Sequence, residues 1–211
     1  MKKFIPLFVL AALVLTSCKT TYMTNSTNVS NQKKKYDKIL VVYREGDMTG
    51  RIALENQIVR DLAAQGVSAV SSVQVIKTDS FQKELTEAEL DQLVDALLDA
   101  GYTGVLVTNL LDKSQYTQVT PGATYGGYGG YYGGFRGYYG AYPMTYREPD
   151  RVTTGIEYIL ETVMFDISDN DGENLQWVGR FSVKNPTDVQ KTVAKYSEEL
   201  VTELMAHSIS N

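Results

Sequence analysis

The sequence predicts an α/β fold of mixed α+β type, in which one small domain has a mixed sheet packed by three helices. Three observations favour this class. In the first half of the chain, short apolar runs alternate with amphipathic helical stretches, which is typical of βαβ units with parallel strands. In the second half, segments that alternate between apolar and polar residues flank a turn, which is typical of antiparallel hairpins. The resulting order is β-α-β-α-β-β-β-α.

The first half of the chain contains the expected parallel strands and the helix between them. Residues 38–43 form a continuous β-branched run, which indicates a buried strand. A helix is expected over residues 49–65, because Gly66 follows it where a C-terminal cap belongs. Residues 67–76 are expected to form the second strand. The expected inward face of the helix contains Ile52, Ile58, Val59, Leu62 and Ala63.

A second helix and a long strand follow. Thr86 and Glu89 have the spacing of a capping box, and Gly101 marks the end of this helix. The apolar stripe of the helix consists of Leu90, Leu93, Val94, Leu97 and Leu98. The next strand is apolar over residues 104–111 and continues as a polar extension to residue 119.

The second half of the chain predicts a hairpin and a closing helix. A long strand is expected over residues 155–167, with an early start near Thr153, and residues 169–172 have the composition of a hairpin turn. A third helix follows, with Asn185 as its N-cap and Pro186 at its first position. The return strand is expected to point Leu175, Trp177, Phe181 and Val183 into the core. The inward face of the third helix is expected to contain Val189, Val193, Tyr196, Leu200 and Leu204.

The two longest predicted strands are longer than the sheet needs. If residues 104–119 and 153–167 pair antiparallel, their polar ends extend beyond the sheet as a long two-stranded β-ribbon. Pro121 and Pro149 then bracket a loop at the tip of this ribbon.

The loop itself, here called the tyrosine-glycine segment (residues 121–149), contains eight of the fifteen tyrosines and nine of the seventeen glycines of the chain. One interpretation is a flexible insertion with no specific ligand. The other is a contact loop for sugar rings, for a protein partner or for further copies of the chain, because tyrosine supplies flat, half-polar contact area. The candidate binding residues are Tyr125, Tyr128, Tyr131, Tyr132, Phe135, Arg136, Tyr138, Tyr139 and Tyr142.

The first residues of the chain have the three regions of a signal peptide. Lys2 and Lys3 are followed by an apolar stretch over residues 4–15, which is too short to span a bilayer. Leu15-Thr16-Ser17-Cys18 then resembles the lipobox of bacterial lipoproteins. The resemblance implies thioether lipidation of Cys18, cleavage before it, and acylation of its new amine with a fatty acid such as palmitate. It also implies anchoring to a membrane of the bacterial cell envelope. The alternative is that Cys18 is an ordinary small residue of the signal peptide.

These features divide the chain into a signal peptide (residues 1–17), a lipidated tether (18–35) and one α/β domain (36–211). The tether is predicted from its polar composition, and the lysines at 33–35 are expected to be solvated or to touch anionic headgroups. Because the residue after Cys18 is lysine rather than aspartate, the common Gram-negative sorting scheme favours the outer membrane.

Composition excludes several classes of function. Without Lys2 and Lys3 the chain has 18 basic and 25 acidic residues, a formal charge of about −7, and nucleic-acid binding requires a basic face instead. His207 is the only histidine and Cys18 the only cysteine, so no metal site, nucleophile-histidine pair or cofactor is expected. Residues 44–51 lack the Gly-Lys-Ser/Thr sequence of a P-loop and the spaced glycines of a dinucleotide-binding site. No catalytic residues are expected, and we therefore expect a protein that is not an enzyme.

Two short motifs give a further resemblance. Residues 165–169, Phe-Asp-Ile-Ser-Asp, precede residues 176–180, Gln-Trp-Val-Gly-Arg, and an amphipathic helix ends the chain. This pattern resembles a group of uncharacterised bacterial envelope lipoproteins, as does the helix end at residues 60–66. The strand order is also similar to that of the amino-terminal domain of the translocation protein TolB. The resemblance spans about half of the mature chain and implies fold and location only.

The sequence thus predicts a membrane-anchored envelope lipoprotein with a structural or interaction role, which presents the tyrosine-glycine segment to an envelope protein. The alternative is a glycan- or peptidoglycan-binding module that uses the same tyrosines on a polysaccharide partner.

Overall fold

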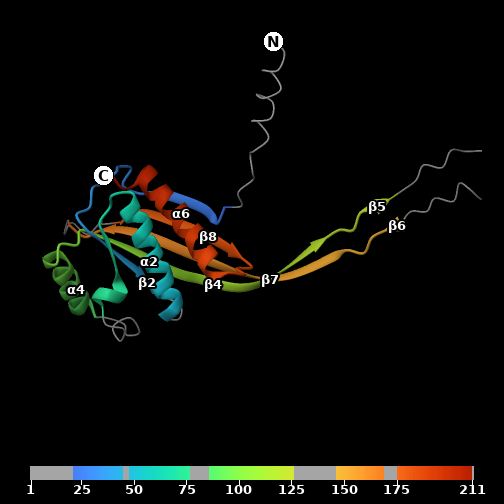
Figure 1. Cartoon of the computed structure of the whole chain (residues 1–211), viewed down its shortest axis with the longest axis horizontal. Coiled ribbons are helices and arrows are strands. Elements are labelled where there is room, and N and C mark those ends of the chain that lie inside the picture. Colours follow the sequence, from blue (N-terminus) through green and yellow to red (C-terminus); the bar gives the residue numbers. More distant parts are fainter. Residues whose placement is uncertain (1–20, 45–47, 77–85, 126–145, 169–174, 211) are drawn as a thin grey trace, which may run out of the picture.

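The computed structural model describes residues 21–44, 48–76, 86–125, 146–168 and 175–210. Six strands form one mixed sheet in the order β1-β8-β7-β4-β2-β3 (Figure 1). These strands are β1 (Met23–Asn28), β2 (Ile39–Tyr43), β3 (Ala69–Ser71), β4 (Gly104–Thr120), β7 (Arg151–Asp166) and β8 (Leu175–Lys184). The helices of the described residues are α2 (Met48–Ala64), α3 (Ser72–Val75), α4 (Glu87–Asp99) and α6 (Val189–His207). The predicted single α/β domain with a mixed sheet is confirmed, and α3, a single turn, is added to the three predicted helices.

Parallel and antiparallel pairs occupy different parts of the sheet, as the sequence predicts. β2 pairs in parallel with both β3 and β4. The remaining pairs, β4 with β7, β7 with β8 and β8 with β1, are antiparallel. β2 therefore lies between the two strands that follow the βα connections, and the long hairpin strands complete the other half of the sheet.

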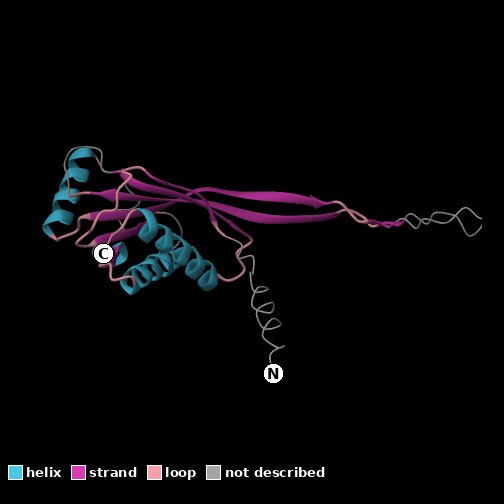
Figure 2. Cartoon of the chain, turned by 90° about the horizontal axis from the view of Figure 1, so that it is seen from above, coloured by secondary structure: helices cyan, strands magenta, loops and turns pink. Residues whose placement is uncertain are grey.

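Helices cover both faces of the sheet. α2 and α6 pack together on one face, where Leu62 and Leu204 join a core that continues through Leu106 and Phe181 of the strands. α4 covers the opposite face near β2, in a smaller cluster around Leu97. Figure 2 shows α2 and α6 on one side of the sheet, while β4 and β7 extend well beyond it. The face covered by α2 and α6 is called the helix side below.

Trp177 lies at the centre of the larger core, as the alternation in its strand predicts. Its side chain is fully buried, and Phe181 and Val183 point to the same side. Gly179 explains the tryptophan-x-glycine pattern, because a Cβ atom at this position would lie 2.1 Å from the indole ring of Trp177. The glycine leaves space for the largest side chain of the core.

The tether predicted over residues 18–35 is wrong from residue 21, where the described part of the chain begins. Met23–Asn28 forms an edge strand that pairs with β8. Its polar side chains are not those of a typical strand, but an edge strand needs one row of backbone hydrogen bonds. The lysine run is also docked: Lys33 Nζ donates to the Met205 carbonyl at 2.7 Å, and Lys34 forms an ion pair with Asp166.

The predicted strand over residues 67–76 is shorter than expected. The strand covers Ala69–Ser71, and the chain then turns into α3, where the Ser71 hydroxyl accepts a hydrogen bond from Val73 N. Helix α2 has nearly its predicted bounds, but its inward face is rotated. Ile52 and Ala63 are exposed, whereas Arg51, Leu54 and Glu55 are buried, because the core accepts a polar cluster that hydrophobic periodicity does not reveal.

The second predicted helix is confirmed as α4. Thr86 and Glu89 form the predicted capping box, and Gly101 follows the helix with φ 81°. Leu97 is buried, but Leu90 in the first turn is 46% exposed. The predicted hairpin turn at residues 169–172 lies outside the described residues.

The third predicted helix begins later than expected. Its N-cap is Asp188, which accepts a hydrogen bond from Lys191 N, and the helix runs over Val189–His207. Tyr196, Leu200 and Leu204 are buried as predicted. Val189 is 62% exposed instead of buried, because it lies in the first turn, beyond the end of the core. Asn185 is left for a different role, described below.

Replacing Trp177 with alanine should destabilise the domain by roughly 3–5 kcal/mol, as removal of a large buried aromatic side chain does. Chemical denaturation measures the loss. Trp177→Phe is the matched control: it should cost less, because it keeps a ring and removes an indole N–H that has no hydrogen-bond partner among the described residues. An alanine variant with unchanged stability would contradict the central position of Trp177.

Candidate functional site

The pairing of β4 with β7 continues far past the rest of the sheet. β2 follows β4 only to Thr108, and β8 follows β7 only to Glu157. Beyond these points, residues 115–120 and 151–156 continue as six residue pairs with no third strand beside them. This two-stranded part is called the ribbon. At about 3.3 Å per residue it extends about 17 Å. Figures 1 and 2 show β4 and β7 projecting beyond the rest of the sheet.

A β-bulge at the base of the ribbon determines which side chains point to the helix side. Leu110 pairs with Leu160, and the next pair joins Asp112 to Ile159, so Leu111 is the extra residue. The alternation of β4 therefore changes from even to odd numbers. Beyond the bulge, the helix side of the ribbon presents Lys113, Gln115, Thr117 and Val119 of β4 opposite Tyr158, Ile156, Thr154 and Val152 of β7.

Asn185 fastens the ribbon to the end of β8. It has a positive φ of 49°. Its side-chain oxygen accepts a hydrogen bond from Ile156 N at 2.9 Å, and its amide nitrogen donates to the Tyr116 hydroxyl at 2.6 Å. A Cβ atom at Gly155 would lie 2.2 Å from the Asn185 side-chain oxygen. Gly155 is therefore needed for the close approach, and Asn185 fixes the base of the ribbon instead of capping a helix.

The far end of the ribbon leads into the tyrosine-glycine segment. After Pro121 the chain forms a short pair between β5 (Thr124–Tyr125) and β6 (Tyr146–Arg147). Of the candidate binding residues, Tyr125 therefore lies in β5. The others, from Tyr128 to Tyr142, lie outside the described residues. The structure thus places both ends of the segment at the tip of the ribbon, as predicted.

An apolar groove of about 240 Å³ lies at the base of the ribbon, on the helix side. It opens between the first turns of α2 and α6, above the sheet. Leu110, Tyr158 and Leu160 form its floor, and Leu54, Pro186 and Val189 lie along its walls. Sequence reasoning missed this groove, because its lining comes from six separate elements.

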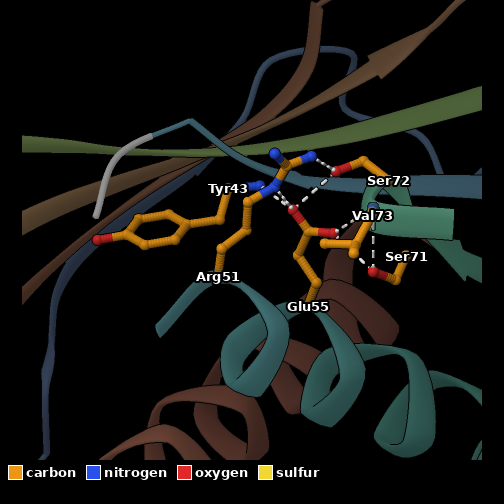
Figure 3. Close-up of polar contacts among 6 residues, drawn as sticks. All are labelled: Tyr43, Arg51, Glu55, Ser71, Ser72 and Val73. Carbon is orange, nitrogen blue, oxygen red and sulfur yellow. Dashed lines mark hydrogen bonds and ion pairs between the residues drawn. The ribbon is translucent and has the colours of Figure 1, made fainter. Parts of the chain in front are cut away.

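Next to the groove, a buried carboxylate links four elements. Glu55 is fully buried and accepts hydrogen bonds from Arg51 Nε at 3.0 Å and from the Ser71 and Ser72 hydroxyls at 2.7 Å (Figure 3). The backbone N–H groups of Tyr43 and Val73 donate to the same carboxylate, at 2.8 and 3.2 Å. With donors on both oxygens, this cluster is a structural link that holds the end of β2 against α2.

The cluster also positions one wall of the groove. In Figure 3 the Tyr43 ring points away from the Glu55 carboxylate, and the same ring lines the groove. A second set of buried polar groups consists of three hydroxyls. The Thr162 hydroxyl is 2.8 Å from that of Thr108 and 2.5 Å from that of Tyr196. Burial raises the pKa of Tyr196, and the hydrogen bonds to Thr162 and Thr108 only partly oppose this rise. Tyr196 is therefore neutral at physiological pH.

The amino-terminal end of the described chain is fixed to α6. Glu199 accepts hydrogen bonds from the Thr21 hydroxyl at 2.8 Å and from the backbone of Tyr22 and Met23 at 2.7 and 2.9 Å. The Ser26 hydroxyl donates to Glu203 at 2.5 Å. Cys18, the predicted lipidation site, lies outside the described residues, only three positions before Thr21.

The described residues contain no group of three or more histidine, cysteine, aspartate or glutamate side chains placed to hold a metal ion. His207 lies at the end of α6, 3.6 Å from Glu203. Within the described part of the chain, no helix is long and apolar enough to cross a membrane.

Comparisons with known proteins leave the family of this chain open. No protein-family model and no curated protein matches it. Among solved structures, it is similar to a PelC dodecamer subunit from Paraburkholderia phytofirmans, with 10% identity, 85% of this chain and 94% of that chain covered, and a TM-score of 0.45. It is also similar to lipoprotein GNA1162 from Neisseria meningitidis, with 13% identity, 80% and 98% covered, and a TM-score of 0.40.

A further similar structure is a putative neuraminyllactose-binding hemagglutinin homolog from Helicobacter pylori, with 10% identity, 83% and 89% covered, and a TM-score of 0.32. At these identities and TM-scores, none of the three assigns a function to this chain.

Asn185→Gly should loosen the ribbon without unfolding the domain. Glycine keeps the positive φ but removes both side-chain hydrogen bonds, each of which contributes about 1 kcal/mol. Amide hydrogen exchange should accelerate at Ile156, while exchange at Leu160, inside the sheet, serves as the internal control and stays unchanged. Equal protection of Ile156 in variant and wild type would show that Asn185 does not fix the ribbon.

Proposed function

We propose that this chain is a lipid-anchored protein of the bacterial envelope that is not an enzyme and that presents its tyrosine-glycine segment to a partner. The observation that carries this proposal is the continuous pairing of β4 with β7, from Gly104 and Asp166 in the sheet to Thr120 and Arg151 at the tip. Sixteen residue pairs hold the two described ends of the segment away from the core of the described domain.

The anchor in this proposal is lipid on Cys18. The lipobox at residues 15–18 supports it, together with the position of Cys18 as the only cysteine of the chain. Two or more acyl chains on one amino terminus are needed for durable attachment to a bilayer. Lys19 favours the outer membrane, because an aspartate in this position favours the inner membrane in the common Gram-negative scheme.

An interaction role is supported by the way the buried polar groups are used. The Glu55 carboxylate is surrounded by its own donors, and the Tyr196 hydroxyl is bonded inside the core. The groove beside them is lined mainly by apolar side chains, and its floor offers no acid-base pair. The described residues therefore favour contact over reaction chemistry.

A second candidate function is binding of a glycan or of peptidoglycan. Its support is the composition of the segment, in which eight tyrosines alternate with glycines, since flat aromatic rings stack on sugar rings and glycine allows them to approach. In this alternative the partner is a polysaccharide rather than an envelope protein.

The anchor is tested by replacing Cys18 with serine. The variant should incorporate no labelled palmitate and should remain at the length of the precursor, because lipid transfer to the sulfur precedes cleavage. Lys19→Asp is the matched control, which should keep the label. Labelling of the Cys18→Ser variant would show that the anchor is assigned to the wrong residue.

The contact role is tested by replacing residues 126–145 with a short Gly-Ser linker. The melting temperature should stay nearly unchanged, because β5, β6 and the sheet are retained. Crosslinking in intact cells should then lose the proteins captured by the wild type, or binding to purified peptidoglycan should be lost if the glycan alternative holds. A control of full length, with serine at the six tyrosines of residues 126–145, separates the role of the rings from that of length. Unfolding on deletion would show that the segment belongs to the core.

A further inference from the structure

The described chain enters the sheet at the same end of the domain from which the ribbon extends. β1 runs antiparallel to β8, and its first residue, Met23, pairs with Phe181. Ser182 N donates to the Tyr22 carbonyl at 2.7 Å, and β8 ends two residues later at Lys184, where the ribbon begins. The chain therefore enters the sheet beside the base of the ribbon and runs away from it.

The lipid attachment point cannot be far from this entry. Only Lys19 and Thr20 separate Cys18 from Thr21, and three Cα steps span at most about 11 Å. The Thr21 hydroxyl donates to Glu199 of α6, so the described chain begins on the helix side of the sheet. A domain lipidated at Cys18 is therefore held close to the bilayer by its ribbon end, instead of being lifted off by a long tether.

Exposed apolar side chains gather at the same end. The ten large apolar side chains that are exposed in the described residues include seven at the ribbon, at its base or in the first turns of α2 and α6. These seven are Met48, Ile52, Leu111, Val119, Val152, Ile156 and Val189. β2 runs parallel to β4, toward the ribbon, so α2, the next helix, begins at this end of the domain. β8 also ends at the base of the ribbon, so α6, which follows it, begins there too. The apolar groove opens in the middle of this set.

The ribbon has one uncharged face, its helix side, where three of the six side chains are apolar. Val119 and Val152 are paired on its helix side, 55% and 60% exposed, and Ile156 follows at 37%. From the bulge outward, the only charged residue on this face is Lys113, whose Nζ lies 5.5 Å from the centre of the Tyr158 ring. The opposite face holds the charges of Asp112, Glu157 and Arg151. Such a division of charge suits a segment that lies at a membrane surface, with one face toward the lipid and the other toward water.

The sequence around the ribbon is also depleted in charge. Residues 114–146 contain one charged side chain, Arg136, although 21% of the whole chain is charged. Tyrosine is enriched at membrane–water interfaces, where its ring is apolar and its hydroxyl hydrated, and lysine extends its ammonium group toward water there. The composition matches an interfacial environment.

We propose that the helix side of the ribbon, together with the first turns of α2 and α6, lies on the membrane surface that holds the lipid of Cys18. This inference rests on the lipid anchor of the proposed function and adds the orientation of the domain. The ribbon then runs along the bilayer, and the tyrosine-glycine segment meets its partner at the membrane surface rather than far from it. The bilayer, and not a second copy of the chain, covers the helix side of the ribbon, because the short link to Cys18 already holds that side at the membrane.

The test uses the lipidated full chain, reconstituted into vesicles of phosphatidylethanolamine and phosphatidylglycerol with brominated acyl chains. Trp177 is the only tryptophan and is fully buried, so it gives a constant background. Val152→Trp places a second indole on the proposed contact face. Its emission should shift to shorter wavelength and lose intensity in brominated vesicles, compared with vesicles of unbrominated lipid.

Two matched variants complete the experiment. Thr153→Trp lies on the opposite face of the same strand and should lose less intensity, and Leu90→Trp on α4 should lose none. Quenching of Val152→Trp that is no stronger than that of Leu90→Trp would overturn the proposal. A shift to shorter wavelength without quenching would also overturn it, since it would show that another protein copy covers the face. Palmitate labelling of the same samples shows whether the lipid is attached. A result caused by a missing anchor can then be told apart from a result caused by a different orientation of the domain.

Discussion

The antiparallel pairing of β4 with β7 is the interaction on which the rest of the structure depends. Its inner half lies at the centre of the sheet, where Leu106, Leu160 and Met164 belong to the main core. Its outer half has no other strand beside it, and a two-stranded ribbon is marginally stable by itself in water. The ribbon therefore takes its direction and its order from strands that are fixed by the core at one end, with Asn185 fastened across the transition.

Buried polar groups give this core its particular shape. The Glu55 carboxylate receives donors from β2, α2, β3 and α3, so it fixes four elements at one point. A buried charge without such partners would be strongly destabilising. The hydroxyl groups of Thr108, Thr162 and Tyr196 tie the two central strands to α6 in the same way. Both sets hold the walls of the apolar groove, and their polar atoms are used within the fold.

Much of the fold could be predicted because its signals are local. The alternation around Trp177 and Phe181 indicated which side of β8 is buried, and Thr86 with Glu89 indicated where α4 begins. The length of the polar strand extensions predicted the ribbon. These features depend on residues within a few positions of one another, and periodicity or spacing is enough to identify them.

The features that could not be predicted depend on partners far along the chain. The polar residues of β1 form a strand because β8 supplies its backbone bonds and Glu199 and Glu203 of α6 supply acceptors. Asn185 precedes a proline as many N-caps do, but its side chain is bonded to Ile156 and Tyr116 instead. The candidate tyrosines from Tyr128 to Tyr142 lie outside the described residues, so their role as contacts stays a prediction.

The docking of β1 has a consequence for the order in which the domain is completed. β1 pairs with β8, and the side chains that accept hydrogen bonds from β1, Glu199 and Glu203, belong to α6. Lys34 also exchanges backbone hydrogen bonds with Ser208 and Ser210. Contacts this distant in sequence form late and slowly, because a long loop must close before they can form. Synthesis proceeds from the amino terminus, so the residues of β1 are made early but are among the last to reach their final positions. A nascent chain that lacks its final helix therefore lacks the side-chain acceptors of β1, and one face of its sheet is left without α6.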